Sequence, residues 1–269
     1  MSQTTSIEWC DHTFNIAWGC MKVSPGCQHC YADTLSNRYG FDVWGPAATT
    51  ERRTFGAKHW AEPRRWNAAA EKAGQRRRVF CCSMCDVFED HPTIDAERAK
   101  LWPLIRETPW LDWQLLTKRP ERIAANLPDD WGAGYPNVWL GTSVESQEYA
   151  DDRIGHLIAV PAAVRFLSAE PLLDRVSLRW ASWAPLNGRR VDRDHLDGVR
   201  GLLHWIIVGG ESGPGARPMA DAWARELRDQ CAEAGIAFFL KQLGGFPNKH
   251  GHGDALLDGQ RYTEMPVPT

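Results

Sequence analysis

Six short apolar runs, separated by longer amphipathic stretches, constrain the fold of this chain more than any other feature of its sequence. The runs cover residues 79–82, 113–116, 138–141, 164–167, 205–208 and 237–240. Largely apolar runs of this length are typical of parallel strands that are buried on both faces. A first strand is expected near residues 13–18, and helices are expected at 94–107, 120–127, 147–158 and 220–234. This alternation of strand and helix predicts an α/β fold, a full or partial TIM-like (β/α) barrel.

The size of the chain fits one barrel domain. Its 269 residues, of which 43% are hydrophobic, are enough to bury a large core. We therefore expect a single domain over residues 1–269. Two stretches fall outside the repeat: an insertion at about 183–203, which could form a lid, and a tail at about 246–269. In the tail, Asp258-Gly259 between apolar residues predicts a tight hairpin.

Charge and hydropathy narrow the class of protein. A net charge of −3 argues against a protein that coats nucleic acid through bulk electrostatics. The basic runs Arg64-Arg65 and Arg76-Arg77-Arg78 could meet phosphates, although a solvated surface is the favoured interpretation. No leader-like or membrane-spanning apolar run is present, so we expect a cytoplasmic protein with no membrane partner. Eight cysteines in such a chain indicate metal binding or catalysis more than disulfides.

Three of these cysteines have the spacing C-x6-C-x2-C. Cys20, Cys27 and Cys30 stand on one loop, and Pro25-Gly26 supplies a turn that can fold the first sulfur back toward the other two. Three thiolates can hold a metal centre and leave one coordination position open for chemistry. A structural zinc site is the competing interpretation. In that case a fourth ligand would come from Cys10, His12 or His29.

Through these cysteines the chain resembles the radical S-adenosylmethionine (SAM) enzymes. That superfamily usually has C-x3-C-x2-C with an aromatic residue before the third cysteine, whereas here the first gap is six residues and that position is His29. The ending Cys30-Tyr31-Ala32 resembles the spore photoproduct lyase branch. Further blocks resemble a phage- and prophage-borne family of unassigned function that is regarded as radical-SAM-like. They cover residues 7–9, 83–88, 141–145, 167–173, 209–213 and 241–244.

The resemblance implies the barrel fold and two cofactors. These are a [4Fe-4S] cluster held by Cys20, Cys27 and Cys30, and SAM on the remaining iron. An external electron donor of the flavodoxin or ferredoxin type would be a partner. The chemistry would be cleavage of SAM and removal of a hydrogen atom from a substrate.

Polar clusters follow the predicted strands at their carboxyl ends, where parallel barrels place their ligand sites. We assign roles from location. Cofactor-binding roles in SAM recognition go to Ser83 and Asp86 for the amino group, Ser143 and Glu145 for the ribose, and Gly209 and Gly210 for close backbone approach to the adenosyl part. Catalytic roles in substrate binding and proton transfer go to Glu170, Glu211, Lys118 and Lys241. Internal ion pairs are the competing interpretation of these four residues.

A second cysteine group is interpreted differently. Neighbouring strand residues point to opposite faces, so Cys81 and Cys82 are not expected to share one metal. Cys82 and Cys85 could form a thiol pair, or Cys85 could donate a hydrogen atom, but small buried residues are the favoured interpretation. Cys10 and Cys231 are expected to be structural, and His250-Gly251-His252 is expected to be a polar loop.

The substrate is the least constrained part of the prediction. The family resemblance favours a nucleobase or nucleotide, in DNA modification or repair. A radical enzyme that modifies a peptide or small metabolite is the second possibility. The third is a non-catalytic zinc or iron–sulfur binding module in phage–host interaction.

Overall fold

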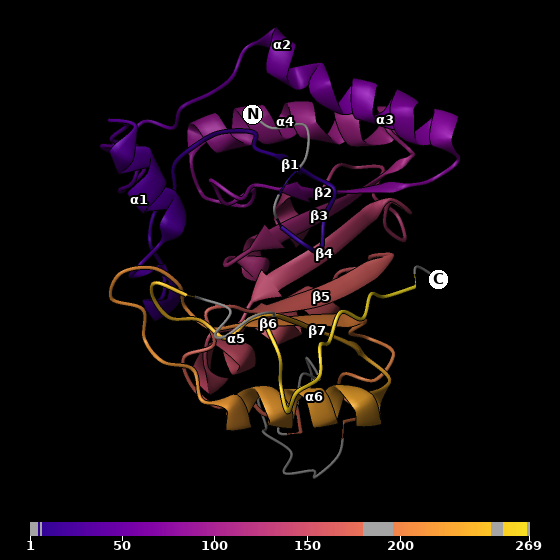
Figure 1. Cartoon of the computed structure of the whole chain (residues 1–269). Coiled ribbons are helices and arrows are strands. Elements are labelled where there is room, and N and C mark those ends of the chain that lie inside the picture. The colour runs from indigo at the N-terminus through magenta and orange to yellow at the C-terminus, as the bar shows by residue number, and fades with distance from the viewer. Residues whose placement is uncertain (1–4, 6, 180–195, 249–254, 268–269) are drawn as a thin grey trace. The chain divides into compact units, whose positions relative to one another are not determined.

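The computed structural model describes residues 5, 7–179, 196–248 and 255–267 (Figure 1). Its strands hydrogen-bond in the order β1-β2-β3-β4-β5-β6-β7, which is also their order along the chain. By their contacts the residues divide into two compact units, described here one at a time. The first unit comprises residues 1–140 and 161–163, and the second comprises 141–160 and 164–269.

The sheet of the first unit begins with three parallel strands. β1 (His12–Phe14) pairs with β2 (Arg77–Cys81), and β2 pairs with β3 (Leu111–Thr117). The first half of β4 (Val138–Ser143) completes it. The helices of this unit are α1 (Tyr31–Arg38), α2 (Ala57–Trp60), α3 (Glu62–Ala73) and α4 (Pro92–Glu107), with 3-10 turns at Pro25–Cys27, Pro120–Arg122 and Ala124–Asn126. α3 packs beside α4 and against β2 and β3 (Figure 1).

Aromatic rings fill the core of the first unit. The fully buried Phe14 ring stacks on His59, with ring centroids 4.5 Å apart, and meets the edge of Trp113 at 5.7 Å. Trp139 is also buried in this unit. In the second unit Trp205 is fully buried. Three of the tryptophans beside apolar runs therefore contribute to the cores.

The second unit continues the sheet with the rest of β4 and with β5 (Val164–Ala169), β6 (Trp205–Gly209) and β7 (Ala237–Gln242). β6 pairs in parallel with both β5 and β7. Its helices are α5 (Gln147–Ile158) and α6 (Asp221–Ala234), and α6 packs against β7. Gly141 admits the Phe166 ring, because a Cβ at this position would lie 2.4 Å from a ring carbon. This contact allows β4 and β5 to pack tightly.

The predicted α/β fold with sequentially ordered parallel strands is confirmed. Each of the seven predicted strands is present within a few residues of its expected position, and three predicted helices correspond to α4, α5 and α6. The helix expected at 120–127 is instead a pair of 3-10 turns. α1, α2 and α3 were not predicted. Within the described residues, none of the helices has the length and apolarity that a membrane crossing requires.

Parts of the predicted insertion and tail are described. Residues 180–195 of the expected 183–203 insertion, and His250-Gly251-His252, lie outside the described residues. The end of the insertion forms turns that bury Leu196, Val199 and Leu203. In the tail, Leu257 and Gln260 exchange backbone hydrogen bonds of 2.9 and 3.0 Å. Asp258 and Gly259 between them have φ values of 55° and 77°, the backbone of a tight type I′ turn.

Candidate functional site

The three cysteines of the C-x6-C-x2-C motif lie on the loop between β1 and α1. The Cys27 amide donates to the Ser24 carbonyl at 2.9 Å and closes a 3-10 turn that starts at Pro25. Cys30 is the N-cap residue of α1. None of the eight cysteines forms a disulfide, and Cys20, Cys27 and Cys30 are all partly exposed. The motif therefore places three thiols on the loop that follows the carboxyl end of β1 and leads into α1.

The backbone around Cys20 is held at several points. Gly19 donates to the Met84 carbonyl at 3.0 Å, and the Cys20 carbonyl accepts from the Gly45 amide at 3.2 Å. Gly19 has a φ of 117°, and a Cβ there would lie 2.3 Å from the Val43 carbonyl oxygen. Glycine is therefore required directly before the first cysteine.

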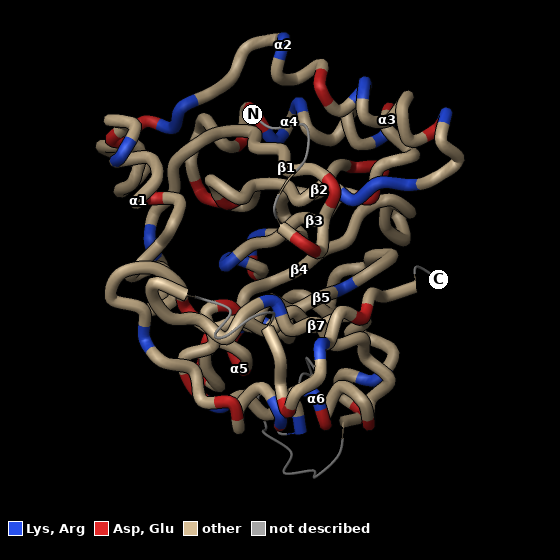
Figure 2. The backbone as a smooth tube through the Cα atoms, viewed as in Figure 1, with Lys and Arg blue, Asp and Glu red and all other residues tan. Residues whose placement is uncertain are grey.

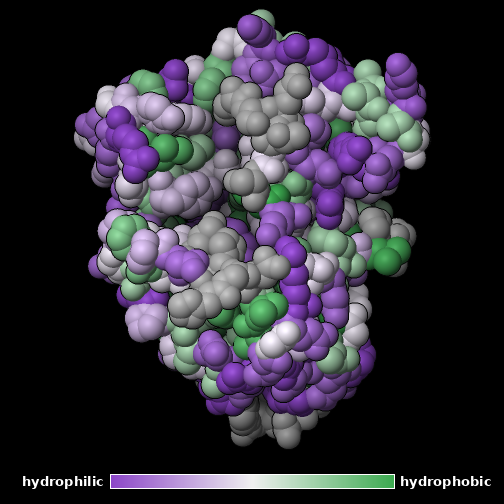
Figure 3. Space-filling view, in the orientation of Figure 1, coloured by the Kyte–Doolittle hydropathy of each residue, from purple (hydrophilic) through white to green (hydrophobic). Residues whose placement is uncertain are grey.

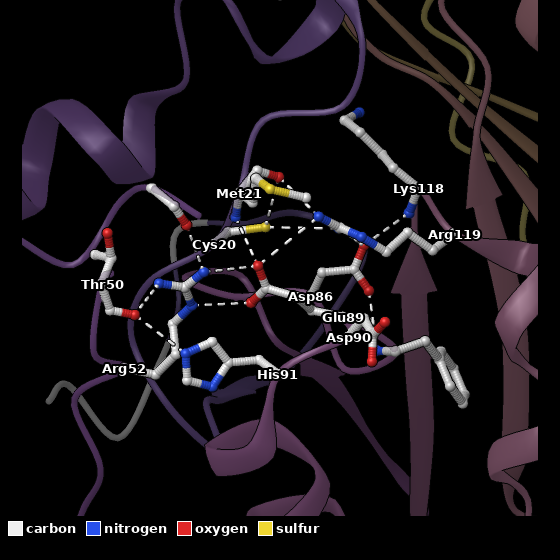
Figure 4. Close-up of polar contacts among 12 residues, drawn as sticks. Cys20, Met21, Thr50, Arg52, Asp86, Glu89, Asp90, His91, Lys118 and Arg119 are labelled. Atoms are coloured by element: carbon white, nitrogen blue, oxygen red, sulfur yellow. Dashed lines mark hydrogen bonds and ion pairs between the residues drawn. The ribbon is translucent and has the colours of Figure 1, made fainter. Parts of the chain in front are cut away.

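Two charged side chains complete this support (Figure 4). The Met21 amide donates to Glu89 Oε1 at 2.7 Å, and the Met21 carbonyl accepts from Arg119 Nη2 at 2.8 Å. Arg119 Nη1 lies 3.7 Å from Cys20 Sγ and 2.9 Å from Asp86 Oδ2. The Arg119 and Asp86 side chains are both 7% exposed. One guanidinium thus contacts a cysteine sulfur, its neighbouring peptide and a buried carboxylate.

Asp86 accepts four hydrogen bonds. Oδ1 accepts from the Phe88 amide and the Thr117 hydroxyl, at 3.0 and 2.6 Å. Oδ2 accepts from the Lys118 amide at 3.0 Å and from Arg119. A role for Asp86 in binding the amino group of SAM stays a prediction, and it would require one of these four bonds to be exchanged. The Lys118 side chain points away from the Asp86 carboxylate (Figure 4).

A fully buried ion pair lies beneath Met21. Arg52 and Glu89 have side chains that are 0% and 1% exposed, and they form two hydrogen bonds of 2.8 and 3.0 Å. The remaining Arg52 donors reach the carbonyl oxygens of Val43, Gly45 and Thr50 at 2.8–3.1 Å. All five guanidinium N–H groups are therefore used. Sequence reasoning missed Arg52, Glu89 and Arg119. Their positions in the sequence could have indicated them. Glu89 follows the same strand end as the predicted site residue Asp86, and Arg119 follows the same strand end as Lys118.

The surroundings of the cysteines affect their acidity. Burial raises the pKa of the Cys20 thiol well above its usual value, and Asp86 and Glu89 raise it further, while Arg119 acts in the opposite direction. Burial also raises the pKa of Cys30, and Lys118 opposes this shift. Each of these two thiols thus has one cation that favours its thiolate form.

The turn at residues 82–85 holds Ser83 next to the cysteine loop. Asn15 Oδ1 accepts from the Met84 amide at 2.7 Å, and Asn15 Nδ2 donates to the Ser83 hydroxyl at 3.1 Å. The Tyr31 hydroxyl donates to the Ser83 carbonyl at 2.7 Å. The backbone oxygen and hydroxyl of Ser83 are thus engaged by residues from β1's end and from α1.

The expectation that Cys81 and Cys82 point apart is wrong. β2 ends at Cys81, and Cys82 has a φ of 67°, so the strand alternation does not continue through it. The two sulfur atoms are 3.7 Å apart, and the Cys82 and Cys85 thiols are hydrogen-bonded. Burial raises the pKa of both Cys82 and Cys85 well above the usual value. These properties are typical of inert, protonated thiols.

The donor set of the loop consists of three thiols, the ligand type that iron–sulfur clusters take. Among the described residues, no three His, Cys, Asp or Glu side chains converge closely enough to hold one metal ion. Of the proposed fourth zinc ligands, the His12 ring stacks on Trp66 at 4.4 Å. Cys20, Cys27 and Cys30 are soft thiol donors, so their chemistry fits the cluster.

The second unit holds the other predicted site residues, and all three of its predicted glutamates, Glu145, Glu170 and Glu211, form ion pairs. Lys241 Nζ donates to Glu170 Oε1 at 2.5 Å, and Gln242 Nε2 lies 3.4 Å from the same oxygen. Glu211, with a side chain 4% exposed, accepts from Arg217 Nη2 at 2.5 Å and from Arg217 Nε at 2.9 Å. The competing interpretation, internal ion pairs, thus describes the geometry of Glu170, Glu211 and Lys241.

Ser143 and Glu145 share one partner, Arg153. Its Nη1 donates to the Ser143 carbonyl and to Glu145 Oε2, both at 2.9 Å, and the Arg153 and Glu145 side chains are both buried.

The fold itself requires glycine at position 210, with or without a ligand, because a Cβ there would lie 2.1 Å from the Leu243 carbonyl oxygen. A Cβ at Gly209 would lie 3.3 Å from the Glu170 side chain.

Four of the five arginines in the basic runs of the first unit are paired with carboxylates. Arg64 bonds Glu107 at 2.6 Å, and Arg76 bonds Asp112 at 2.5 Å. Asp11 lies 3.3 Å from both Arg77 and Arg78, which belong to the basic stretch at the start of β2 (Figure 2). Hydrophilic residues also gather over α2 and the start of α3 (Figure 3). These observations favour a solvated surface over a phosphate-binding one.

Residues 4–266 match a protein family described as "Protein of unknown function (DUF5131)". The chain belongs to this family. A search of curated proteins finds no match. Nothing in these matches bears on a phage origin.

Solved structures of spore photoproduct lyase are similar to this DUF5131 chain. One is a variant with a cysteine replaced by serine, which has 13% identity and a TM-score of 0.50 over 90% of this chain and 80% of that one. Another, with bound AdoMet and dinucleoside spore photoproduct, has 13% identity and a TM-score of 0.40. That match covers 60% of this chain but only 46% of the lyase chain. The first likeness shows that the DUF5131 chain shares the lyase fold.

Proposed function

We propose that this protein is a radical SAM enzyme. The observation that carries the proposal is the placement of Cys20, Cys27 and Cys30, three thiols outside any disulfide, on the loop after β1. In sheets of parallel strands, such loops at the carboxyl ends carry the ligand sites. The shared fold with a spore photoproduct lyase supports the same function.

In this proposal the three cysteines hold a [4Fe-4S] cluster, and SAM binds the remaining iron. When bound, the cluster would supply the electron that cleaves SAM, and the resulting 5′-deoxyadenosyl radical would remove a hydrogen atom from the substrate. The electron would come from an external flavodoxin or ferredoxin. The protein's own residues position the cysteines: Arg119 and Glu89 hold the Met21 peptide, and Ser24 supports the Cys27 turn.

Substrate and SAM binding are assigned to polar residues at the strand ends. Ser83 and Asp86 in the first unit, and Ser143, Glu145, Gly209 and Gly210 in the second, are proposed for SAM. Lys118, Glu170, Glu211 and Lys241 are proposed for the substrate. In the structure Glu170 pairs with Lys241 and Glu211 pairs with Arg217. The substrate proposed is a nucleobase or nucleotide, supported by the lyase-like Cys30-Tyr31-Ala32 ending.

The cluster is tested first. Protein reconstituted without oxygen should hold about four irons and four sulfides per chain, as one [4Fe-4S] cluster requires. Cys27→Ala should lose the cluster, because it removes one of three protein ligands, while Cys231→Ala, a buried thiol of the second unit, should keep it. Stoichiometric zinc in protein purified without oxygen, or an unchanged cluster in Cys27→Ala, would refute the proposal.

The reaction is tested next. SAM should perturb the spectrum of the cluster, and a strong reductant should then release 5′-deoxyadenosine. Deuterium transfer from labelled nucleosides, DNA or peptides into 5′-deoxyadenosine would identify the class of substrate. An intact cluster that never cleaves SAM, with any of these substrates present, would argue decisively against a radical SAM enzyme.

A further inference from the structure

We propose that Arg119 is a positioning residue that holds Cys20 for the cluster and places a fixed positive charge beside it. The inference rests on the proposed function, because it assumes that Cys20 is a cluster ligand. It goes beyond that function by assigning a role to a residue outside the cysteine motif.

The need for such a residue follows from the spacing of the motif. Six residues separate Cys20 from Cys27, and the 3-10 turn at Pro25–Cys27 orders only the later part of this segment. Met21, Lys22 and Val23 are exposed. A loop this long does not fix its first cysteine relative to the other two, since each added residue increases the freedom that must be lost on binding. Contacts from outside the loop must therefore hold Cys20.

Arg119, just after β3, supplies two of these contacts. Its Nη2 donates to the Met21 carbonyl at 2.8 Å and its Nη1 lies 3.7 Å from Cys20 Sγ, so one rigid planar group spans the cysteine and the peptide that follows it (Figure 4). Asp86 in turn holds Nη1 at 2.9 Å. The Thr117 hydroxyl accepts from the Arg119 amide at 2.9 Å and donates to Asp86. The orientation of the guanidinium is thus determined by groups that do not belong to the cysteine loop.

The charge of Arg119 is the second part of the role. Two buried arginines, Arg52 and Arg119, face two buried carboxylates, Asp86 and Glu89, so the four side chains are neutral together. Arg119 is the member of this group that contacts the sulfur. A positive charge at this distance stabilises the more negative, reduced state of a cluster bound through Cys20.

The test uses the full-length protein, reconstituted without oxygen, with three variants. Arg119→Gln should lose iron to a chelator faster or bind it more weakly by about 10- to 100-fold, the usual effect of removing an outer partner of a metal ligand. Its cluster should also have a more negative midpoint potential. Arg119→Lys keeps the charge but not the two-pronged contact, so its potential should stay near the wild-type value while its iron retention falls.

Arg122→Gln is the matched control, because Arg122 lies on the same segment and bonds Phe88 and Asp90 instead of Cys20. Arg122→Gln should change neither the iron retention nor the midpoint potential of the cluster. Arg119→Gln with wild-type potential and iron retention, or an equal effect of Arg122→Gln, would overturn the positioning role alone. A wild-type protein that assembles no [4Fe-4S] cluster would overturn the proposed function and, with it, this role.

Discussion

At the scale of single residues, the molecule repeatedly places an arginine against a carboxylate near a strand end. Arg119 with Asp86 and Arg52 with Glu89 lie in the first unit, and Arg153 with Glu145 and Arg217 with Glu211 lie in the second. Arg217 differs from the other three arginines, since its side chain is 30% exposed. The pair of Glu211 and Arg217 is therefore the one in which a ligand could most readily reach the charge.

Glu211→Gln should separate a structural role from a catalytic one. The change removes a charged acceptor of three hydrogen bonds from Arg217, so unfolding free energy should fall by about 2 kcal/mol. Thermal or urea unfolding measures this loss, and Glu226→Gln, in an exposed pair with Arg175, should show little change. If Glu211 also acts on the substrate, product formation should stop while iron content is kept. Normal unfolding together with normal turnover would remove Glu211 from the site.

The sequence identified the cysteines and several strand-end charges, but not their partners. Cys20, Cys27 and Cys30 stand out in the sequence because their spacing predicts a shared metal centre, which stays a prediction. Arg52 could not, because an arginine among polar residues looks exposed until the carbonyl oxygens that surround it are known. Cys82 was misinterpreted for a related reason: a left-handed backbone is rare for cysteine and has no sequence signal.

At the scale of elements, the connection after β6 depends on close approach between two backbones. Gly210 donates to the Gln242 carbonyl at 3.1 Å, and the Gly245 amide donates to the Glu211 carbonyl at 2.7 Å. Gly210 leaves no room for a side chain beside Leu243. This contact positions both Glu211 and Gln242.

Gly210→Ala should therefore destabilise the protein whether or not SAM is present. The added Cβ would lie 2.1 Å from the Leu243 carbonyl oxygen, and relieving this clash should cost on the order of 3 kcal/mol. Gly155→Ala is the control, because a Cβ there meets nothing within 4 Å and alanine favours the helix α5. A Gly210→Ala protein with wild-type melting that fails only to bind SAM would instead support the cofactor role.

The packing of α2 on β1 should make stability depend on pH. Burial lowers the pKa of His59 below its ordinary value of 6.5, although its contact with the Asn15 carbonyl and the carboxylate of Glu62 oppose the shift. The unfolded chain then binds a proton more readily than the folded one. The stability present above pH 6.5 should thus decrease as pH falls below 6.5, by at most about 1.4 kcal/mol per pH unit for this proton.

Melting temperatures between pH 7.5 and 5 test this dependence. His59→Gln should flatten the slope, because glutamine can still donate to Asn15 but does not titrate. Burial also lowers the pKa of His204, so His204 should account for the pH dependence of stability that is left in His59→Gln. An identical slope in wild type and His59→Gln would contradict the assignment.

The unpredicted elements are those with little buried apolar surface. α1 buries only Ala32 and Ser36, and α3 buries only Pro63 and Ala70, so neither shows the periodic apolar face on which helix prediction depends. Two 3-10 turns at Pro120–Arg122 and Ala124–Asn126 replace the expected helix. The Asn126 side chain donates to the Arg122 carbonyl, the acceptor that an α-helix would use, while the Asn126 amide bonds the Ile123 carbonyl instead.

At the scale of the whole molecule, the class of fold was predictable because buried strands leave a strong pattern. The runs at β3 to β7 are almost entirely apolar and inaccessible, and a helix or turn follows each in the order that a sequential parallel sheet requires. The long path from β1 to β2 carried no such pattern. This path contains the cysteine loop and the three helices that the sequence did not predict, α1, α2 and α3.

The distance along the chain between Cys20 and Arg119 has a consequence for synthesis. The two residues are 99 positions apart. At about 5–20 residues per second, the ribosome adds Arg119 roughly 5–20 s after Cys20. During that interval the nascent cysteine loop has neither its neighbouring strands nor its guanidinium contact. For the proposed cluster ligands, oxidation or premature capture of metal would therefore be a greater hazard in the growing chain than in the finished protein, and the timing of iron delivery would matter as well as its supply.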